Sequence, residues 1–160
     1  MGPLVATSIW LLGCGGGTEE PKPLDFQVEL KDTSAERCLK GANVKRERKE
    51  AEPAKITVRH VLVKFAGAKN ADASVKRNRE QACLRAQEAY RKLTSGTDFE
   101  KIVGEYSEEP GAATRGGSIG AIQRRDVAPP FADAAFELEP NQVSEVVESD
   151  FGFHIIMRTE

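Results

Sequence analysis

The stretch ITVRHVLVKF, residues 56–65, decides the fold of this chain. β-Branched residues dominate it and its side chains alternate between two faces, which predicts a β-strand. His60 lies on one of these faces together with three apolar residues, Ile56, Val58 and Leu62. A second stretch, GFHIIMR at residues 152–158, predicts another strand, which carries His154. The predicted domain therefore begins and ends with a strand that contains one histidine.

Two helices and a loop are expected after the first of these strands. Residues 75–93 have alanine and leucine at helical spacing. Thr97 and Glu100 form the pattern of a capping box, which indicates the start of a second helix. Glycines and prolines are frequent in residues 107–117, so we expect a loop there.

The remaining elements lead to the last strand. Residues 118–122 predict a short strand, and Pro129 stands where a proline is tolerated, in the first turn of a helix. Residues 143–147 predict a further strand, which pairs with the last one. The sequence thus predicts an α+β domain over residues 56–160, with a small antiparallel four-stranded sheet surrounded by helices.

Composition limits the possible functions. The chain has 160 residues, a formal net charge of −2 and a pI near 5.8. This charge gives no general attraction to nucleic acid, so we expect no nucleic-acid partner. Cys14, Cys38 and Cys83 form no CxxC pair, and the histidines stand far from them. We expect neither a metal site nor a cofactor, and a small core residue at Cys83. For Cys38 no strong partner is evident, so it is either a free thiol or one that pairs between molecules.

The N-terminal part of the chain differs from the rest. An apolar run at residues 4–12 is too short to span a bilayer and ends abruptly before Cys14. Residues 14–55 are rich in glycine and proline at their start and in charge at their end, which predicts a flexible charged tether. Within this tether, alternating apolar residues at 25–30 allow one short strand.

Three clusters in residues 56–160, taken together, resemble the parvulin family of peptidyl-prolyl cis/trans isomerases. They are HVLVK at 60–64, the segment from SEEP at 107–110 through RGGSIG at 115–120 to Pro130 and Phe131, and FGFHII at 151–156. One cluster alone is weak, but their order and spacing make the resemblance specific. It implies a parvulin-like domain of the FKBP-like superfold that isomerises X-Pro peptide bonds.

The resemblance also implies roles for single residues. Three apolar residues match the positions that hold the proline ring, namely Ile119, Val127 and Phe131. His60 and His154 match the paired histidines that organise hydrogen bonds beneath the amide. Glu109 stands where relatives carry Cys or Asp, and Ser149 matches a hydroxyl of the same network. Taken without the resemblance, Phe131 and the two histidines are more typical of residues in a hydrophobic core. Glu109 is equally typical of a solvent-exposed acidic residue in a loop.

Substrate preference is read from the residues after the first strand. Phosphate-directed parvulins carry a basic cluster there, and this chain has Lys64, Lys69 and Asn70 where the phospho-specific members have a lysine and two arginines. Two guanidinium groups hold a phosphate better than one ammonium does. We therefore assign Lys64 and Lys69 to substrate binding and expect weak or no preference for phosphorylated substrates.

The run Leu11-Leu12-Gly13-Cys14 resembles the lipobox of bacterial lipoproteins. The resemblance implies a signal peptide at residues 1–13 and a lipid anchor on Cys14, which places the protein in the bacterial cell envelope, and Gly15 suggests sorting to the outer membrane. One departure from the family is that no Lys or Arg precedes Lys22, although signal peptides open with basic residues.

Together these features predict a monomeric, lipid-anchored peptidyl-prolyl isomerase. Its substrates would be proline-containing polypeptides, namely exported or envelope proteins whose folding it assists. The alternative is a non-catalytic chaperone or peptide-binding module on the same fold, because a fold does not determine a function.

Overall fold

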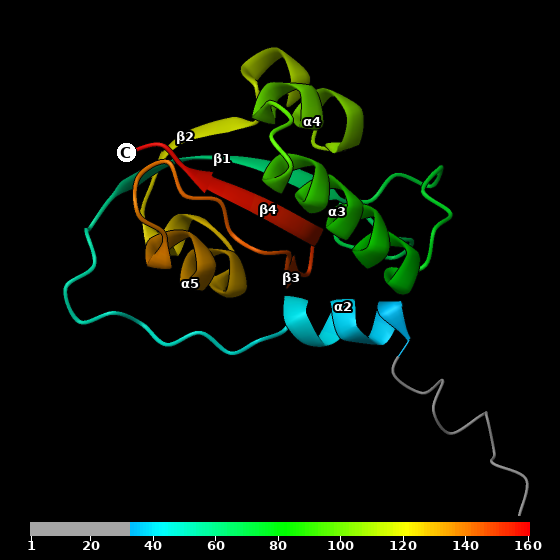
Figure 1. Ribbon diagram of the computed structural model, residues 1–160, viewed down its shortest axis with the longest axis horizontal. Helices are drawn as coiled ribbons and strands as arrows, with labels where there is room; N and C mark the ends of the chain where they lie inside the picture. The colour runs from blue at the N-terminus through cyan, green and yellow to red at the C-terminus, as the bar shows by residue number, and fades with distance from the viewer. Residues whose placement is uncertain (1–32) are drawn as a thin grey trace, which may run out of the picture. The chain divides into compact units, whose positions relative to one another are not determined.

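The computed structural model describes residues 33–160 (Figure 1). Four antiparallel strands form one sheet in the order β2-β1-β4-β3. The strands are β1 (Ile56–Val63), β2 (Ser118–Ile122), β3 (Val147–Ser149) and β4 (Gly152–Arg158). The α-helices are α2 (Ser34–Ala42), α3 (Arg79–Thr94), α4 (Phe99–Tyr106) and α5 (Pro129–Glu137). This arrangement confirms the α+β class and the four-stranded antiparallel sheet surrounded by helices.

The two histidine-bearing strands, β1 and β4, are neighbours at the centre of the sheet. Their register places Leu62 opposite His154 and His60 opposite Ile156. Residues opposite one another point to the same face, as do residues two apart in a strand, so both imidazoles lie on one face. Gly117 makes the approach to β1 possible, because at its φ of +77° a Cβ would lie 2.5 Å from the His60 carbonyl oxygen.

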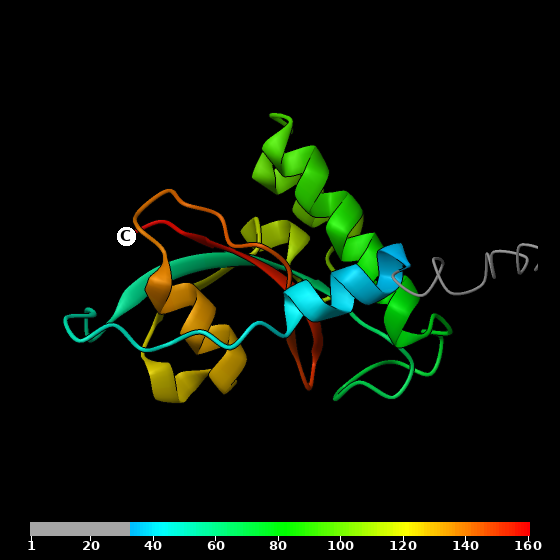
Figure 2. The same cartoon turned by 60° about the horizontal axis from the view of Figure 1, so that its bottom comes forward.

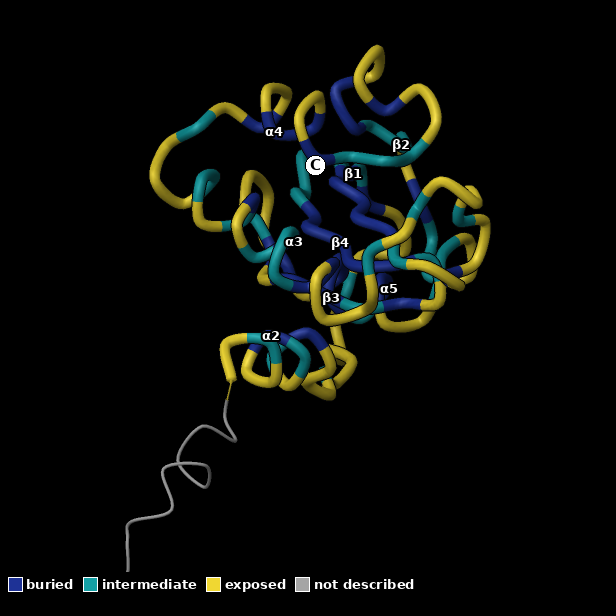
Figure 3. Tube along the Cα trace, turned by 90° about the vertical axis from the view of Figure 1, so that its right-hand side faces the viewer, coloured by how far each residue is buried: buried dark blue, intermediate teal, exposed yellow. Residues whose placement is uncertain are grey.

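Each face of the sheet has its own hydrophobic core. On one face, Val61, Val63 and Phe153 belong to the core that includes the buried residues of α3 and α4. On the other face, Val58 and Ile156 belong to the core that includes α5. Figure 2 shows α3 and α5 on opposite sides of the sheet, and Figure 3 shows that most of the chain in β1 and β4 is buried. The face that carries the histidines is the face covered by α5.

Some element boundaries differ from those predicted. The helix expected at residues 75–93 begins at Arg79, because Asn78 forms the N-cap. α4 is capped by Asp98 and not by Thr97, because the Asp98 carboxylate accepts hydrogen bonds from the backbone N–H groups of Glu100 and Lys101. The strand expected at 143–147 is limited to an isolated bridge at Val143, and β3 starts where that strand was expected to end.

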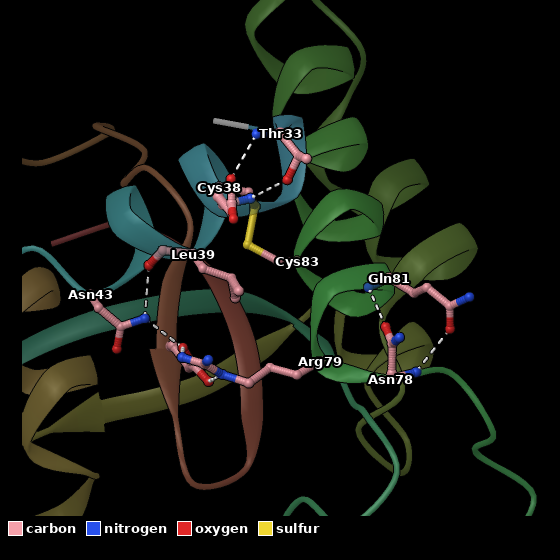
Figure 4. The surroundings of a disulfide bond; sticks show 10 residues. Thr33, Cys38, Leu39, Asn43, Asn78, Arg79, Gln81 and Cys83 are labelled. Carbon is pink, nitrogen blue, oxygen red and sulfur yellow. Dashed lines mark hydrogen bonds and ion pairs between the residues drawn. A yellow bond between two sulfur atoms is a disulfide. The ribbon is translucent and has the colours of Figure 1, made fainter. Parts of the chain in front are cut away.

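Residues 33–42 correct the prediction of a flexible tether. Thr33 and Glu36 form a capping box that begins α2. Cys38 on this helix forms a disulfide with Cys83 on α3, where we expected no partner (Figure 4). Cys83 is buried as expected, but as half of the disulfide. A cross-link over a sequence separation of 45 residues destabilises the unfolded chain by about 4 kcal/mol in the loop-entropy view, which offsets the weak apolar character of α2.

We call residues 33–55 the N-terminal arm. After α2 the arm continues as an extended segment beside α5 (Figure 2). The Glu52 carboxylate, whose side chain is 6% exposed, lies 2.5 Å from Arg124. Nearer to α2, Arg46 pairs with Glu137 at 3.4 Å and Lys49 donates a hydrogen bond to the Glu137 carbonyl at 2.8 Å. The arm is therefore attached to the domain along its length.

The predictions made for residues 1–32 lie outside the described part of the chain. They are the signal peptide at 1–13, the lipidated Cys14, the first part of the tether and the strand at 25–30. Among residues 33–160, no helix has the length and the apolar character that a membrane crossing requires.

Candidate active site

Three buried rings form the centre of the candidate site. His60 and His154 lie nearly parallel, with their ring centroids 5.5 Å apart and an interplanar angle of 16°. The Phe131 ring stands with its edge toward both, at centroid distances of 5.4 Å and 5.1 Å. Phe131 comes from the first turn of α5, which begins with Pro129 and Pro130. α5 thus places one aromatic wall over the two histidines of the sheet.

A chain of hydrogen bonds joins the four residues assigned to catalysis. The Ser149 hydroxyl lies 2.6 Å from His154 Nε2. The two Nδ1 atoms of His154 and His60 are 3.3 Å apart. His60 Nε2 lies 2.8 Å from the Glu109 carboxylate. The structure therefore brings together all four residues in one continuous network, although their catalytic roles stay predictions.

The charge of Glu109 sets the direction of the hydrogen bond at its end of the network. The hydrogen bond from His60 holds the pKa of Glu109 below its usual value, with smaller contributions from the charges of Arg115 and Lys64. Burial lowers the pKa of His154 well below its usual range, and His60 adds to this effect. An ionised Glu109 can only accept, so His60 donates to it from Nε2. A His60 Nδ1 without a proton accepts from His154 Nδ1, and Ser149 then donates its hydroxyl proton to His154 Nε2.

A pocket of about 210 Å³ opens above this network. Its wall is mainly apolar, and its floor carries the polar atoms of the hydrogen-bond chain. The lining residues are His60, Leu62, Glu109, Ile119, Asp126, Val127, Ala128, Phe131, Ser149, Phe151 and His154. All three residues predicted to hold the proline ring are among them. The pocket combines a small apolar cup with an anionic edge, which suits a ring attached to a polar amide.

The two lysines assigned to substrate binding do not line the pocket. Lys64 is buried and donates from Nζ to the Asn70 carbonyl at 2.8 Å. The Lys69 ammonium lies 4.9 Å from the centroid of the Phe151 ring, and Phe151 does line the pocket. Each lysine therefore already has a partner within the protein.

Four lining residues were not singled out from the sequence. Leu62 and Phe151 were part of the quoted clusters, but their apolar side chains gave no sign of a separate role. Ala128 and Asp126 carried no signal, because their position depends on the short 3₁₀ helix Arg124–Asp126 that precedes α5. Asp126 is the second carboxylate in the lining of the pocket, in addition to Glu109.

The arrangement supports a reaction that forms no covalent bond to the protein. Rotation about an X-Pro amide is opposed by a barrier of about 18–20 kcal/mol, because planarity preserves resonance. A catalyst of this rotation needs to hold the ring, exclude water and favour the twisted amide over the planar one. The cup and the polar floor supply the groups for these tasks.

Comparison with known proteins gives the same result. The family model described as Rotamase: PPIC-type PPIASE domain matches residues 60–160. The chain belongs to this family of peptidyl-prolyl cis/trans isomerases, and it carries the isomerase domain of that family.

Relatives and solved structures agree with this assignment. The chain is 35% identical over 136 residues to Foldase protein PrsA 4 of Bacillus cereus, which covers 84% of this chain and 42% of that protein. It is 36% identical over 112 residues to the putative peptidyl-prolyl cis-trans isomerase dodo of Drosophila melanogaster, with 66% of each covered. The structure of peptidyl-prolyl isomerase ESS1 from Candida albicans matches with a TM-score of 0.62 and 25% identity, covering 67% of this chain and 63% of that chain. The parvulin fold is therefore confirmed.

The similarity to the foldases is partial in length. The matched part of this chain covers 42% of the Bacillus cereus foldase. It covers 22% of Foldase protein PrsA of Halalkalibacterium halodurans, to which the chain is 41% identical over 75 residues.

The low pKa of His154 predicts a specific pH dependence of stability. Below about pH 6.5 the unfolded chain protonates this histidine, whereas the folded chain keeps it neutral, so stability is lost as the pH falls. Between pH 7.5 and 5.5 we expect the free energy of unfolding to fall by about 1 kcal/mol more in the wild type than in His154→Asn. Urea unfolding followed by circular dichroism measures both values, and equal losses in the two proteins would contradict the prediction.

Proposed function

We propose that this protein isomerises X-Pro bonds in exported or envelope proteins and so assists their folding. The observation that supports this most directly is the pocket itself, with Phe131 as its wall and the chain from Ser149 to Glu109 as its floor. The names of two matched relatives, a foldase and a peptidyl-prolyl isomerase, agree with the proposed assistance of folding and with the proposed isomerisation. The substrates are proline-containing polypeptides bound by one copy of the chain.

The proline ring enters the cup formed by Ile119, Val127 and Phe131, where burial of its carbons provides binding energy. The carbonyl of the preceding residue then faces Glu109. In the planar amide, resonance places negative charge on this oxygen, and the ionised Glu109 repels that charge. Rotation reduces the charge on the oxygen, so the twisted amide is destabilised less than the planar one. Differential interaction of this kind accelerates rotation.

The disulfide agrees with an exported protein. Disulfides persist in oxidising compartments and are rare in the cytosol. We propose further that Cys14 carries the lipid anchor and that residues 1–13 are removed as a signal peptide. Several acyl chains on one cysteine provide a firm attachment, since each buried CH₂ contributes about 0.8 kcal/mol.

Replacement of Phe131 by alanine should remove the wall of the cup. We expect a roughly 100-fold fall in kcat/KM toward a short Ala-Pro peptide, because about 3 kcal/mol of contact with the twisted state is lost. A protease-coupled assay measures the rate. Phe136→Ala is the matched control, since Phe136 is equally buried on α5 but does not line the pocket. With both variants folded by circular dichroism, only Phe131→Ala should lose activity.

The same experiment separates the enzyme from a binding module. A wild type that accelerates no X-Pro peptide above the uncatalysed rate, but binds such peptides, favours the non-catalytic chaperone. Equal activity in Phe131→Ala and Phe136→Ala would contradict the assignment of Phe131 to the cup.

Peptides with phospho-Ser before proline should be isomerised with nearly the same kcat/KM as peptides with Glu or Ala at that position. Lys64 and Lys69 already have partners in the protein, and Glu109 repels a phosphate. We expect kcat/KM values within about tenfold across this panel, which corresponds to less than 1.4 kcal/mol. The double variant Lys69→Arg with Asn70→Arg should raise the phospho-Ser preference. A large phospho-Ser advantage in the wild type would overturn this prediction.

The lipid anchor can be tested by metabolic labelling. The full chain is expressed in bacteria grown with radioactive palmitate. The wild-type protein should become labelled and Cys14→Ser should not, because the acyl groups are attached to the Cys14 thiol and amine. Cys38→Ser should still be labelled, which controls for the loss of a cysteine as such. Label on Cys14→Ser equal to the wild type, or none on either, would exclude the anchor.

A further inference from the structure

Glu148 is the middle residue of β3 and points away from the pocket. In the register of β3 and β4 it lies opposite Phe153, which belongs to the core on the α3 side of the sheet. The next residue, Ser149, lines the pocket on the other side. Successive side chains of a strand point to opposite faces. β3 therefore carries a carboxylate on one face, directly beside the hydroxyl that starts the hydrogen-bond chain on the other.

Two residues from outside the sheet hold the Glu148 carboxylate. Arg79, the first residue of α3, donates from Nε to one oxygen at 2.5 Å and from Nη2 to the other at 2.6 Å. Asn43, which caps α2, donates from Nδ2 at 2.5 Å. The Glu148 side chain is only 11% exposed, so water has limited access to it. A bidentate pair between guanidinium and carboxylate is strong and fixes the orientation of both groups.

The disulfide joins the same two helices that supply these donors. Cys38 and Asn43 belong to α2 and its cap, and Arg79 and Cys83 both belong to α3. Figure 4 shows the side chains of Asn43 and Arg79 converging from the two helices, with the disulfide between the helices nearby. The disulfide therefore fixes the helix from which Asn43 reaches Glu148.

β3 depends on such contacts because it is short and lies at the edge of the sheet. It has three residues, and among the strands of residues 33–160 it pairs only with β4. The Ser149 hydroxyl accepts the Phe151 backbone N–H at 3.1 Å and forms its second hydrogen bond with His154 Nε2 at 2.6 Å. A displacement of β3 by about half an ångström or more would weaken this bond, since hydrogen bonds weaken steeply beyond their normal length.

We propose that Glu148 is a positioning residue for the isomerase site and that the Cys38–Cys83 disulfide makes its action redox-dependent. The proposal rests on the function proposed for the pocket. Glu148 does not touch the substrate. Its carboxylate, held by Arg79 and Asn43, fixes β3 and keeps Ser149 on His154. Reduction of the disulfide releases α2, which withdraws Asn43 from Glu148 and leaves Arg79 as the remaining partner.

The test uses the full chain in a Cys14→Ser background, so that Cys38 and Cys83 are the only thiols. The proteins are this parent, Glu148→Ala, and Glu145→Ala as the matched control, because Glu145 is an exposed glutamate in the segment before β3. Each is measured oxidised and after reduction with dithiothreitol. The first readout is kcat and KM for an Ala-Pro peptide. The second is the ¹⁵N NMR signal of the His154 imidazole, which responds to its bond with Ser149 whether or not the protein is active.

We expect Glu148→Ala to lower kcat about fivefold, the effect of about one hydrogen bond, with KM within about twofold because the cup is intact. The His154 Nε2 signal should move in the same variant, and both readouts should stay unchanged in Glu145→Ala. Reduction should lower kcat in the parent and in Glu145→Ala, but have no further effect in Glu148→Ala. If Glu148→Ala is unfolded, Asn43→Ala, which removes one donor only, should show a smaller change in the same direction.

Parental kcat and an unmoved His154 signal in Glu148→Ala would overturn the proposal. So would an equal loss on reduction in the parent and in Glu148→Ala, because the disulfide would then act without Glu148. A parent that isomerises no peptide contradicts the proposed function alone. In that case the His154 signal still decides whether Glu148 positions Ser149.

Discussion

A hydrogen bond between two buried imidazoles, His60 Nδ1 and His154 Nδ1 at 3.3 Å, connects the sheet to the pocket. Two ring nitrogens of this kind meet only if β1 and β4 pair in the observed register, since a shift by one residue would turn one histidine to the opposite face. One of the two nitrogens has to donate and the other has to accept. The protonation of each ring is therefore tied to the other, and through them Ser149 is tied to Glu109.

This coupling divides the site into two halves of different chemistry. The half under α5 is apolar, and Phe131 closes it with its ring edge toward both imidazoles. The half formed by the sheet and the loop after α4 is polar, and its charge lies at the Glu109 end, where the side chain is 27% exposed. Placing the charge at the partly exposed end avoids the large cost of burying an unpaired carboxylate. The buried end carries a neutral hydroxyl instead.

Much of the fold could be read from the sequence because its elements are periodic. The alternation in residues 56–65 and 152–158 and the helical spacing around Ala82 and Ala86 gave strands and helices in the right order. The pocket residues that a family motif marks, such as Phe131 and His154, were found as well. The α2 helix was missed although its capping box and the apolar spacing of Ala35, Cys38, Leu39 and Ala42 were present, because the polar and charged residues around them favoured a tether. The partner that holds this helix, Cys83, lies 45 residues away, and a disulfide over that distance leaves no local pattern.

The order of the strands has a consequence for the synthesis of the protein. The two histidines stand 94 residues apart in the sequence, on the first and the last strand, and yet are direct neighbours in the sheet. Contacts between distant residues form late, because the long loop between them has to close first. A ribosome that has made β1, α3, α4 and α5 has therefore not yet made a working site. The pocket is completed only when β4 has left the ribosome, so a nascent chain of this isomerase cannot act on its own prolines until the whole domain has been made.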